Sequence, residues 1–169
     1  IAEEKDLEVE AIKLLILELS NYDGASFLAH FDDEIENDKL NILLSAIDKY
    51  VKDFIPVQHI LGYTYFYGYK LNVSKDVLVP RCETEELVGY VLEYYDEIFK
   101  GKSVEVCDIG TGSGAISIAL NKEEPKMNLT ATDISKEALE IAKLNARNND
   151  ASIKFLEGDL LEPLINNNL

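Results

Sequence analysis

The sequence predicts an α/β protein in three parts: a small N-terminal helical bundle, a β-hairpin linker, and the first half of a Rossmann-like parallel sheet. Three observations lead to this prediction. Apolar residues recur at helical spacing over the first third of the chain, tyrosines then alternate at strand spacing, and strand-like and helix-like runs alternate to the end. We expect the boundaries to be 1–56 for the helical domain, 57–82 for the linker and 83–169 for the partial sheet domain.

The helical bundle is expected over about residues 3–55. Its apolar stripes are Leu7, Ala11, Leu14 and Leu15 in one helix and Leu40, Leu43, Leu44, Ile47 and Val51 in another. The dipeptide Asp23-Gly24 and the acidic run 32–38 interrupt the helical pattern, and Pro56 ends it.

The linker has the two-residue period of a β-strand. Its tyrosines stand at alternate positions, Tyr63, Tyr65, Tyr67 and Tyr69. Glycines at 62 and 68 and a turn at 74–76 bound this run and the short apolar runs 71–73 and 77–79, so we expect a β-hairpin. Alternating tyrosines also suit a base-stacking platform, but the scarcity of positive charge nearby favours packing within a sheet.

The last part alternates strands and helices. A helix is expected over 84–100, beginning near Thr84 with acids in its first turn and ending at Gly101. Five further elements follow it: strand 104–109, helix 115–120, strand 129–132, helix 136–148 with Ser135 as N-cap, and a short strand at 153–156. This order predicts a parallel sheet with right-handed crossovers.

A glycine-rich turn joins the first of these strands to its helix. Gly110, Gly112 and Gly114 stand at alternate positions, where the backbone must turn sharply and allow a ligand to approach closely. The same letters satisfy the G-x-G-x-x-A pattern of dinucleotide-binding folds, so NAD remains an alternative ligand.

Three acids stand at or directly after the carboxyl ends of the three strands. Asp108, just before the glycines, suits a cationic ammonium or sulfonium group and would be poorly placed beside a pyrophosphate. Asp133, 25 residues later, can accept both hydroxyls of a ribose, and Asp159 can accept from an adenine amino group. Because the turn carries no Lys or Arg, this arrangement favours S-adenosylmethionine over NAD or NADP.

Composition excludes several classes of protein. The 169 residues include 32 acids and 16 basic residues, a net charge of −16, which argues against binding nucleic acid phosphates or an anionic membrane. No apolar run reaches the roughly 18 residues of a membrane span, so we expect a cytoplasmic protein. Cys82 and Cys107 lie far apart without other ligand residues, so neither a disulfide nor a metal site is expected. Cys107 is expected to be a packed core thiol.

Three segments resemble one family. Residues 56–62 (Pro-Val-Gln-His-Ile-Leu-Gly) resemble its Pro-x-Gln-Tyr-Ile-x-Gly linker, residues 80–85 (Pro-Arg-Cys-Glu-Thr-Glu) resemble its Pro-Arg-Pro-Glu-Thr-Glu stretch, and residues 108–116 resemble its cofactor loop. On these motifs the chain is identified as a member of the HemK/PrmC family, the protein N5-glutamine methyltransferases that modify peptide release factors. Cys82 stands where the family has a proline.

The resemblance implies methyl transfer from S-adenosylmethionine to the side-chain amide nitrogen of a glutamine, in the Gly-Gly-Gln loop of a peptide chain release factor. It implies that the methionine part lies along Gly110, Thr111, Gly112, Ser113 and Gly114. Asp133 would hold the ribose, with Ile134 against the adenine and Asp159 and Leu160 at the border of the base. Arg81, Glu83 and Thr84 would lie near the substrate, or equally would pin the hairpin to the sheet.

The resemblance also implies partners. The acidic helical domain, in which twelve acids and two lysines fall within residues 1–38, would meet the release factor. We expect no membrane or direct nucleic acid partner, and a monomer in the full-length form. Two alternatives stay open: methylation of a ribosomal-protein glutamine or of DNA adenine on the same scaffold, and a non-catalytic partner-binding module.

One family motif is missing. Family members carry Asn-Pro-Pro-Tyr at the end of a fourth strand, and this chain contains no such motif, so no catalytic residue is assigned to it. Since the chain also begins at Ile1 rather than Met, we expect a fragment that is inactive by itself. With three strands present, strand 104–109 is expected to be an exposed edge.

Overall fold

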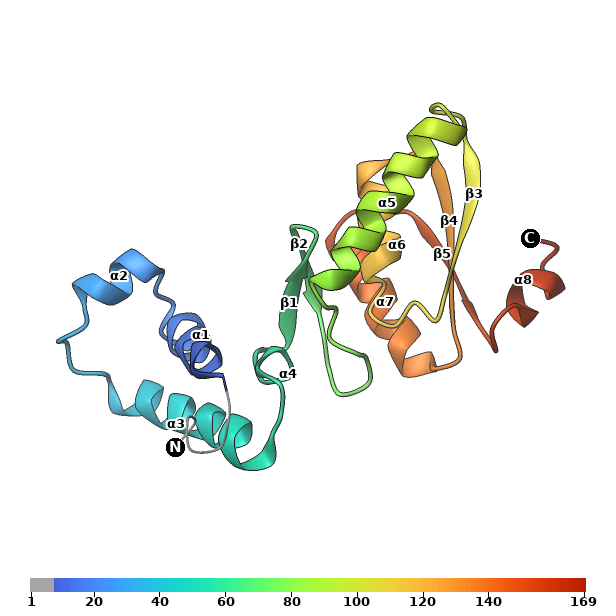
Figure 1. Cartoon of the computed structure of the whole chain (residues 1–169). Coiled ribbons are helices and arrows are strands. Elements are labelled where there is room, and N and C mark those ends of the chain that lie inside the picture. Colours follow the sequence, from blue (N-terminus) through green and yellow to red (C-terminus); the bar gives the residue numbers. More distant parts are fainter. Residues whose placement is uncertain (1–7) are drawn as a thin grey trace. The chain divides into compact units, whose positions relative to one another are not determined.

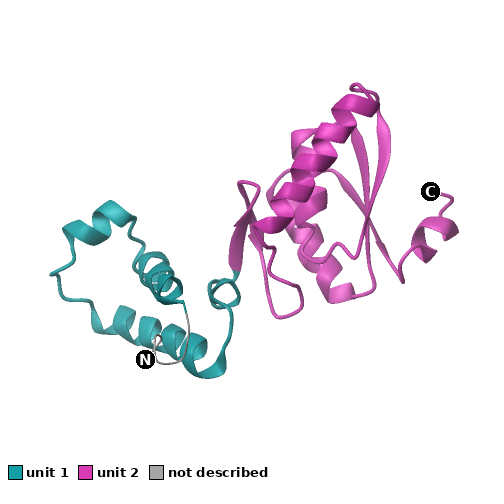
Figure 2. Cartoon of the chain, viewed as in Figure 1, with its two compact units in different colours: residues 1–62 teal, residues 63–169 magenta. Residues whose placement is uncertain are grey.

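The computed structural model describes residues 8–169. The chain divides into two compact units, residues 1–62 and 63–169 (Figure 2). The predicted helix start before Glu8, with Leu7 and the acids Glu3, Glu4 and Asp6, lies outside the described residues. The segment expected as a linker falls partly in each unit, since its first residues form a helix of the first unit and its hairpin belongs to the second.

The first unit is helical, as predicted. Its described elements are α1 (Val9–Ser20), α2 (Gly24–Ala29), α3 (Asn37–Asp53) and α4 (Val57–Leu61). The Asp23 carboxylate caps α2 by accepting from the Ser26 N–H at 2.7 Å. Leu15, Ala46 and Val57 form the buried centre, one from each of the three helices that pack together. Two members of the predicted stripes, Leu14 and Leu44, are exposed, because each of the described helices is covered by its neighbouring helices on one face only.

The second unit begins with a tight hairpin of β1 (Tyr63–Phe66) and β2 (Tyr69–Asn72). The two turn residues, Tyr67 and Gly68, have φ of 51° and 81°, values that match the twist of a two-residue hairpin. The residues it buries most deeply are Phe66 and Leu71, whereas Tyr65 is exposed. Of the four tyrosines expected to pack within a sheet, Tyr67 and Tyr69 pack against the core, and Tyr63 is half-buried with its ring edge-on to that of Tyr65.

The prediction of β-structure for residues 77–79 is wrong. Residues 73–82 form a loop, in which the side chains of Val73 and Val77 are buried against Ala138 of helix α7 (Lys136–Asn148). Their apolar character reflects this packing on a helix rather than strand pairing.

The rest of the second unit is the predicted parallel sheet. Its strands are β3 (Val104–Ile109), β4 (Met127–Asp133) and β5 (Ile153–Glu157), in the order β3-β4-β5, so β3 is an edge strand as expected. Figure 1 shows α5 (Glu83–Ile98), α6 (Ala115–Glu123) and α7 on one side of these strands. The core lies between them and includes Val88, Ile118, Leu120 and Met127. Helix α8 (Glu162–Asn166) follows β5.

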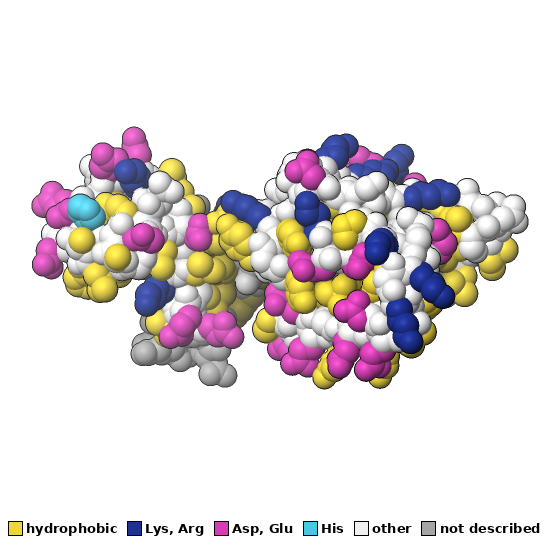
Figure 3. All heavy atoms as spheres, turned by 90° about the horizontal axis from the view of Figure 1, so that it is seen from above, with side chains coloured by type: hydrophobic (Ala, Val, Ile, Leu, Met, Phe, Trp, Pro, Cys, Tyr) yellow, Lys and Arg dark blue, Asp and Glu magenta, His cyan; other side chains and the backbone are white. Residues whose placement is uncertain are grey.

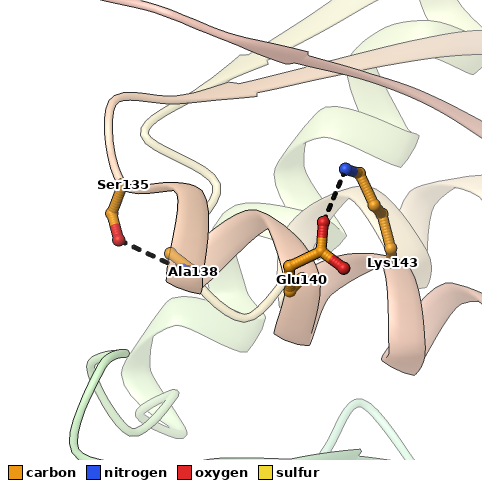
Figure 4. A network of polar contacts seen from close by, with 4 residues as sticks. All are labelled: Ser135, Ala138, Glu140 and Lys143. Carbon is orange, nitrogen blue, oxygen red and sulfur yellow. Dashed lines mark hydrogen bonds and ion pairs between the residues drawn. The ribbon is translucent and has the colours of Figure 1, made fainter.

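Helix α7 begins as the sequence predicts. The Ser135 hydroxyl oxygen accepts from the Ala138 N–H at 3.1 Å, and one turn later Lys143 donates to Glu140 at 2.9 Å (Figure 4). The N-cap places the first turn of α7 directly after Asp133, at the carboxyl end of β4.

The prediction that Cys107 is a core thiol is wrong. Along β3 the side chains alternate, with Val104 and Val106 facing the helices and Cys107 and Ile109 exposed on the opposite face. An apolar strand is thus buried on one face only. Among residues 8–169, no helix combines the length and the apolar composition that a membrane span needs.

Candidate functional site

The glycine turn between β3 and α6 adopts a backbone that favours glycine. Gly110, Gly112 and Gly114 have φ of 76°, 56° and 82°. A Cβ atom at Gly114 would lie 3.2 Å from the Cβ of Ala142, so this glycine also lets the turn pack against α7. A Cβ at Gly110 or Gly112 would meet nothing within 4 Å. The turn therefore presents bare backbone to open space, as close approach by a ligand requires.

Hydrogen bonds tie the turn to the end of the next strand. The N–H groups of Gly110 and Thr111 both donate to the Thr132 carbonyl at 2.9 Å. The Gly112 N–H donates to Oδ2 of Asp133 at 2.8 Å. The turn and the carboxyl end of β4 consequently form one hydrogen-bonded unit.

Asp108 is oriented by two hydroxyl groups. Thr111 and Ser117 donate to its Oδ2 at 2.7 and 2.6 Å, and both of these residues are buried. Since both bonds end on one oxygen, Oδ1 keeps its capacity to accept from a ligand. Ser117 was not predicted as a site residue; its signal in the sequence is a hydroxyl within an otherwise apolar helical run.

Asp133 connects three loops. Its Oδ1 accepts from the Ser135 N–H at 2.9 Å, its Oδ2 accepts from Gly112, and its carbonyl accepts from the Gly158 N–H at 3.0 Å. A carboxylate has about four acceptor positions, so two bonds leave room for the pair of hydroxyls expected there.

Ile134 and Leu160 expose apolar side chains beside these strand ends. Their exposed fractions are 70% and 68%, and the Thr132 hydroxyl donates to the Leu160 carbonyl at 3.5 Å, which links the ends of β4 and β5. Asp159 is exposed in the turn before α8, where its carbonyl accepts from the Glu162 N–H at 3.0 Å. The three strand ends that the sequence analysis selected thus share one edge of the sheet.

The three residues expected near the substrate lie before and at the start of α5. Arg81 and Glu83 are exposed, and the Thr84 N–H donates to the Arg81 carbonyl at 3.0 Å. The backbone N–H of Glu83 and the Cys82 thiol hydrogen-bond its carboxylate and lower the pKa of Glu83. Within residues 8–169, no hydrogen bond joins these three residues to the glycine turn.

The hairpin is held by a different acid. Glu85 accepts from the Tyr67 N–H at 2.8 Å through Oε1, and this contact connects the turn of the hairpin to the first turn of α5. Glu85 belongs to the motif at 80–85 but was not among the site residues selected from the sequence. In the part of the chain described here, no three or more His, Cys, Asp and Glu side chains are grouped to hold a metal ion.

Known proteins resemble this chain over most of its length. Residues 92–169 match the methyltransferase small domain. The chain is 42% identical over 160 residues to the release factor glutamine methyltransferase of Bacillus subtilis, an alignment that covers 94% of this chain and 55% of that protein. It is 34% identical over 166 residues to the protein of the same name from Staphylococcus aureus, covering 98% of this chain and 58% of that protein.

The solved structure of Pyrococcus abyssi tRNA (uracil-54, C5)-methyltransferase, in complex with S-adenosyl-L-homocysteine, matches with a TM-score of 0.47 and 18% identity, over 57% of this chain and 23% of that chain. The chain spans about half the length of the curated relatives it matches. Over nearly its whole length the chain is similar to proteins named release factor glutamine methyltransferase.

Proposed function

We propose that this chain is the cofactor-binding portion of an enzyme that transfers a methyl group from S-adenosylmethionine to the side-chain amide nitrogen of a glutamine in a peptide chain release factor. The observation that carries the proposal is Asp108, fixed by two buried hydroxyls at the carboxyl end of β3 with one carboxylate oxygen left for a ligand. The family relationship supports the substrate class.

The residues at the turn suit this cofactor. Asp108 offers negative charge to the ammonium or sulfonium group, and the bare backbone at Gly110 and Gly112 allows the methionine part to lie against the turn. A pyrophosphate would instead meet the Asp108 carboxylate with no Lys or Arg in residues 110–114 to offset the repulsion. The charge arrangement therefore favours S-adenosylmethionine over NAD.

The remaining residues suit the nucleoside. Asp133 has two acceptor positions for the ribose hydroxyls, and Ile134 and Leu160 offer exposed apolar side chains to the adenine. Asp159 is the acceptor proposed for the adenine amino group. When bound, S-adenosylmethionine supplies an activated methyl group, and the role of these residues is to bind and orient it.

The first unit is proposed to meet the release factor. All acids among residues 8–38 are exposed (Glu8, Glu10, Glu18, Asp23, Asp32, Asp33, Glu34, Glu36 and Asp38). Figure 3 shows acidic and hydrophobic side chains next to each other on this unit's visible face, a surface that suits a basic protein partner with apolar contacts. We propose a cytoplasmic protein that is a monomer in its full-length form.

Arg81, Glu83 and Thr84 are proposed to lie near the substrate glutamine rather than the cofactor, and no catalytic residue is assigned within the chain. Because the chain contains no Asn-Pro-Pro-Tyr, we expect the 169-residue polypeptide to bind cofactor without transferring its methyl group.

Titration calorimetry of the 169-residue chain with S-adenosylhomocysteine and with NADH tests the cofactor assignment. We expect heat of binding with S-adenosylhomocysteine and none with NADH. Binding of NADH alone would overturn the proposal. For the substrate, a release factor should bind the chain with an affinity that falls as salt rises, and salt-independent binding would argue against the acidic surface.

A further inference from the structure

One buried side chain joins the hairpin to the glycine turn. Asn145, in the last part of α7, has an exposed fraction of 0%. Its Nδ2 donates to the Ser113 carbonyl in the turn at 2.9 Å and to the Asn72 carbonyl at the end of β2 at 3.0 Å. Its Oδ1 accepts from the N–H of Asn72 at 2.7 Å and from the Nδ2 of Asn72 at 2.9 Å.

The chemistry of the partners fixes the orientation of this amide. A backbone N–H can only donate and a carbonyl can only accept, so turning the amide over would set donor against donor at Asn72 and acceptor against acceptor at Ser113. Both Nδ2 hydrogens and both acceptor positions of Oδ1 are used. An amide buried with every bond made holds its partners firmly, because a change in either partner leaves a buried polar group unpaired.

The two partners have different roles in the molecule. Ser113 is a buried residue of the turn proposed to bind the methionine part of the cofactor. Asn72 ends the hairpin, which Glu85 holds at its opposite end through the Tyr67 N–H. Asn145 is therefore a direct link between the position of the hairpin and the backbone of the cofactor turn.

We propose that Asn145 is a positioning residue that couples the β1–β2 hairpin to the glycine turn, so that docking of the hairpin and binding of cofactor strengthen each other. The inference rests on the proposed function, because it assigns the cofactor to residues 110–114. Coupling between two sites is reciprocal. If the docked hairpin stabilises the turn in the conformation that binds cofactor, bound cofactor must stabilise the docked hairpin by the same free energy.

A matched pair of variants separates this role from general support of α7. Asn145→Ala removes the link. Asn149→Ala, at the C-cap of α7, removes the Nδ2 bonds to the Lys70 carbonyl of the same strand at 3.0 Å and to the Asn145 backbone carbonyl at 2.9 Å, neither of which reaches the turn. Asn145→Ala loses four hydrogen bonds, of which the one to the Ser113 carbonyl reaches the turn. Loss of this buried bond is expected to weaken S-adenosylhomocysteine binding about tenfold, whereas Asn149→Ala should weaken it less than about twofold.

Hydrogen exchange distinguishes coupling between the hairpin and the turn from purely structural support of α7. In the unaltered chain, saturating S-adenosylhomocysteine should slow exchange of the Asn72 amide, which is remote from the proposed ligand contacts; in Asn149→Ala this protection should persist. Asn72→Ala removes only the Nδ2 bond to Asn145, keeps the backbone bonds, and is expected to weaken binding about threefold. This milder variant decides the question if Asn145→Ala does not fold.

Equal affinities for the ligand in Asn145→Ala and Asn149→Ala would overturn the proposal, as would unchanged affinity in Asn72→Ala or an Asn72 amide that the ligand leaves unprotected. If the unaltered chain does not bind S-adenosylhomocysteine, the proposed function fails instead. The coupling is then tested without ligand: the amides of Gly112 and Gly114 must exchange faster in Asn145→Ala than in Asn149→Ala, and equal rates refute it.

Discussion

Asp108→Asn tests the charge at the centre of the proposed site. The substitution keeps the shape of the side chain and an oxygen that can accept from Thr111 and Ser117, so the turn should retain its fold. It removes the negative charge that would face the cationic part of the ligand. Its effect on binding therefore measures the electrostatic contribution of Asp108 rather than the integrity of the loop.

The magnitude follows from the surroundings of the carboxylate. The two hydroxyls that orient Asp108 belong to buried residues, so water screens the charge incompletely. A hydrogen bond to a charged group contributes about 1.5–3 kcal/mol, and losing it should weaken binding about 10- to 150-fold. Titration calorimetry with S-adenosylhomocysteine and with S-adenosylmethionine measures this loss.

The two ligands distinguish the cation that Asp108 faces. Equal losses indicate the ammonium group that both carry, whereas a larger loss for S-adenosylmethionine indicates its sulfonium. Glu105→Gln is the matched control, because Glu105 lies on the same strand but is exposed on the opposite face, and it should change affinity less than about twofold. If Asp108→Asn binds S-adenosylhomocysteine within twofold of the unaltered chain, the charge argument for this site is refuted.

Three further predictions concern the fold. Gly114→Ala places a Cβ 3.2 Å from that of Ala142 at a φ of 82°, and we expect thermal denaturation to show a loss of about 1–3 kcal/mol. Burial first, and then the 2.7 Å bond to Glu123, raises the pKa of Tyr69 to about 12. Because the unfolded phenol titrates near pH 10, this contribution to stability is complete below about pH 10 and is lost as pH rises toward 12, and Tyr69→Phe should flatten that decline in denaturant melts. Cys82 and Cys107 are both exposed, so a thiol reagent should modify both in the folded protein without denaturant.

Each of these predictions has an outcome that contradicts it. Gly24→Ala is the control for Gly114→Ala, because Gly24 is also the residue at the start of a helix and a Cβ there meets nothing within 4 Å. Equal stability of the two variants would contradict the steric argument. An unchanged alkaline decline in Tyr69→Phe would show that this phenol is not responsible for it. If Cys107 reacts only after unfolding, its thiol is buried in the folded protein, contrary to the structure and in line with the predicted core position.

Much of the fold could be predicted from local sequence pattern. The strand at 104–109 and the helix at 136–148 with its Ser135 cap have the predicted bounds, because periodicity and capping act over a few neighbouring residues. The glycine turn and the positions of Asp108, Asp133 and Asp159 at the carboxyl ends of successive strands could be predicted in the same way. Parallel strands bring their carboxyl ends to one edge, so the order of elements was enough to predict that these segments meet.

Which face of an element is covered was decided by the tertiary structure. Val106 and Cys107 are neighbours in one apolar strand, yet only Val106 faces the helices, and Val77 is buried on α7 although its run reads as a strand. The contacts of Ser117 with Asp108 and of Asn145 with Asn72 and Ser113 join residues that are distant in sequence or lie within runs of ordinary helix. Local pattern determined the elements and the glycine turn, whereas packing between elements selected the side chains that orient that turn, because burial and hydrogen-bond partners depend on which surfaces meet.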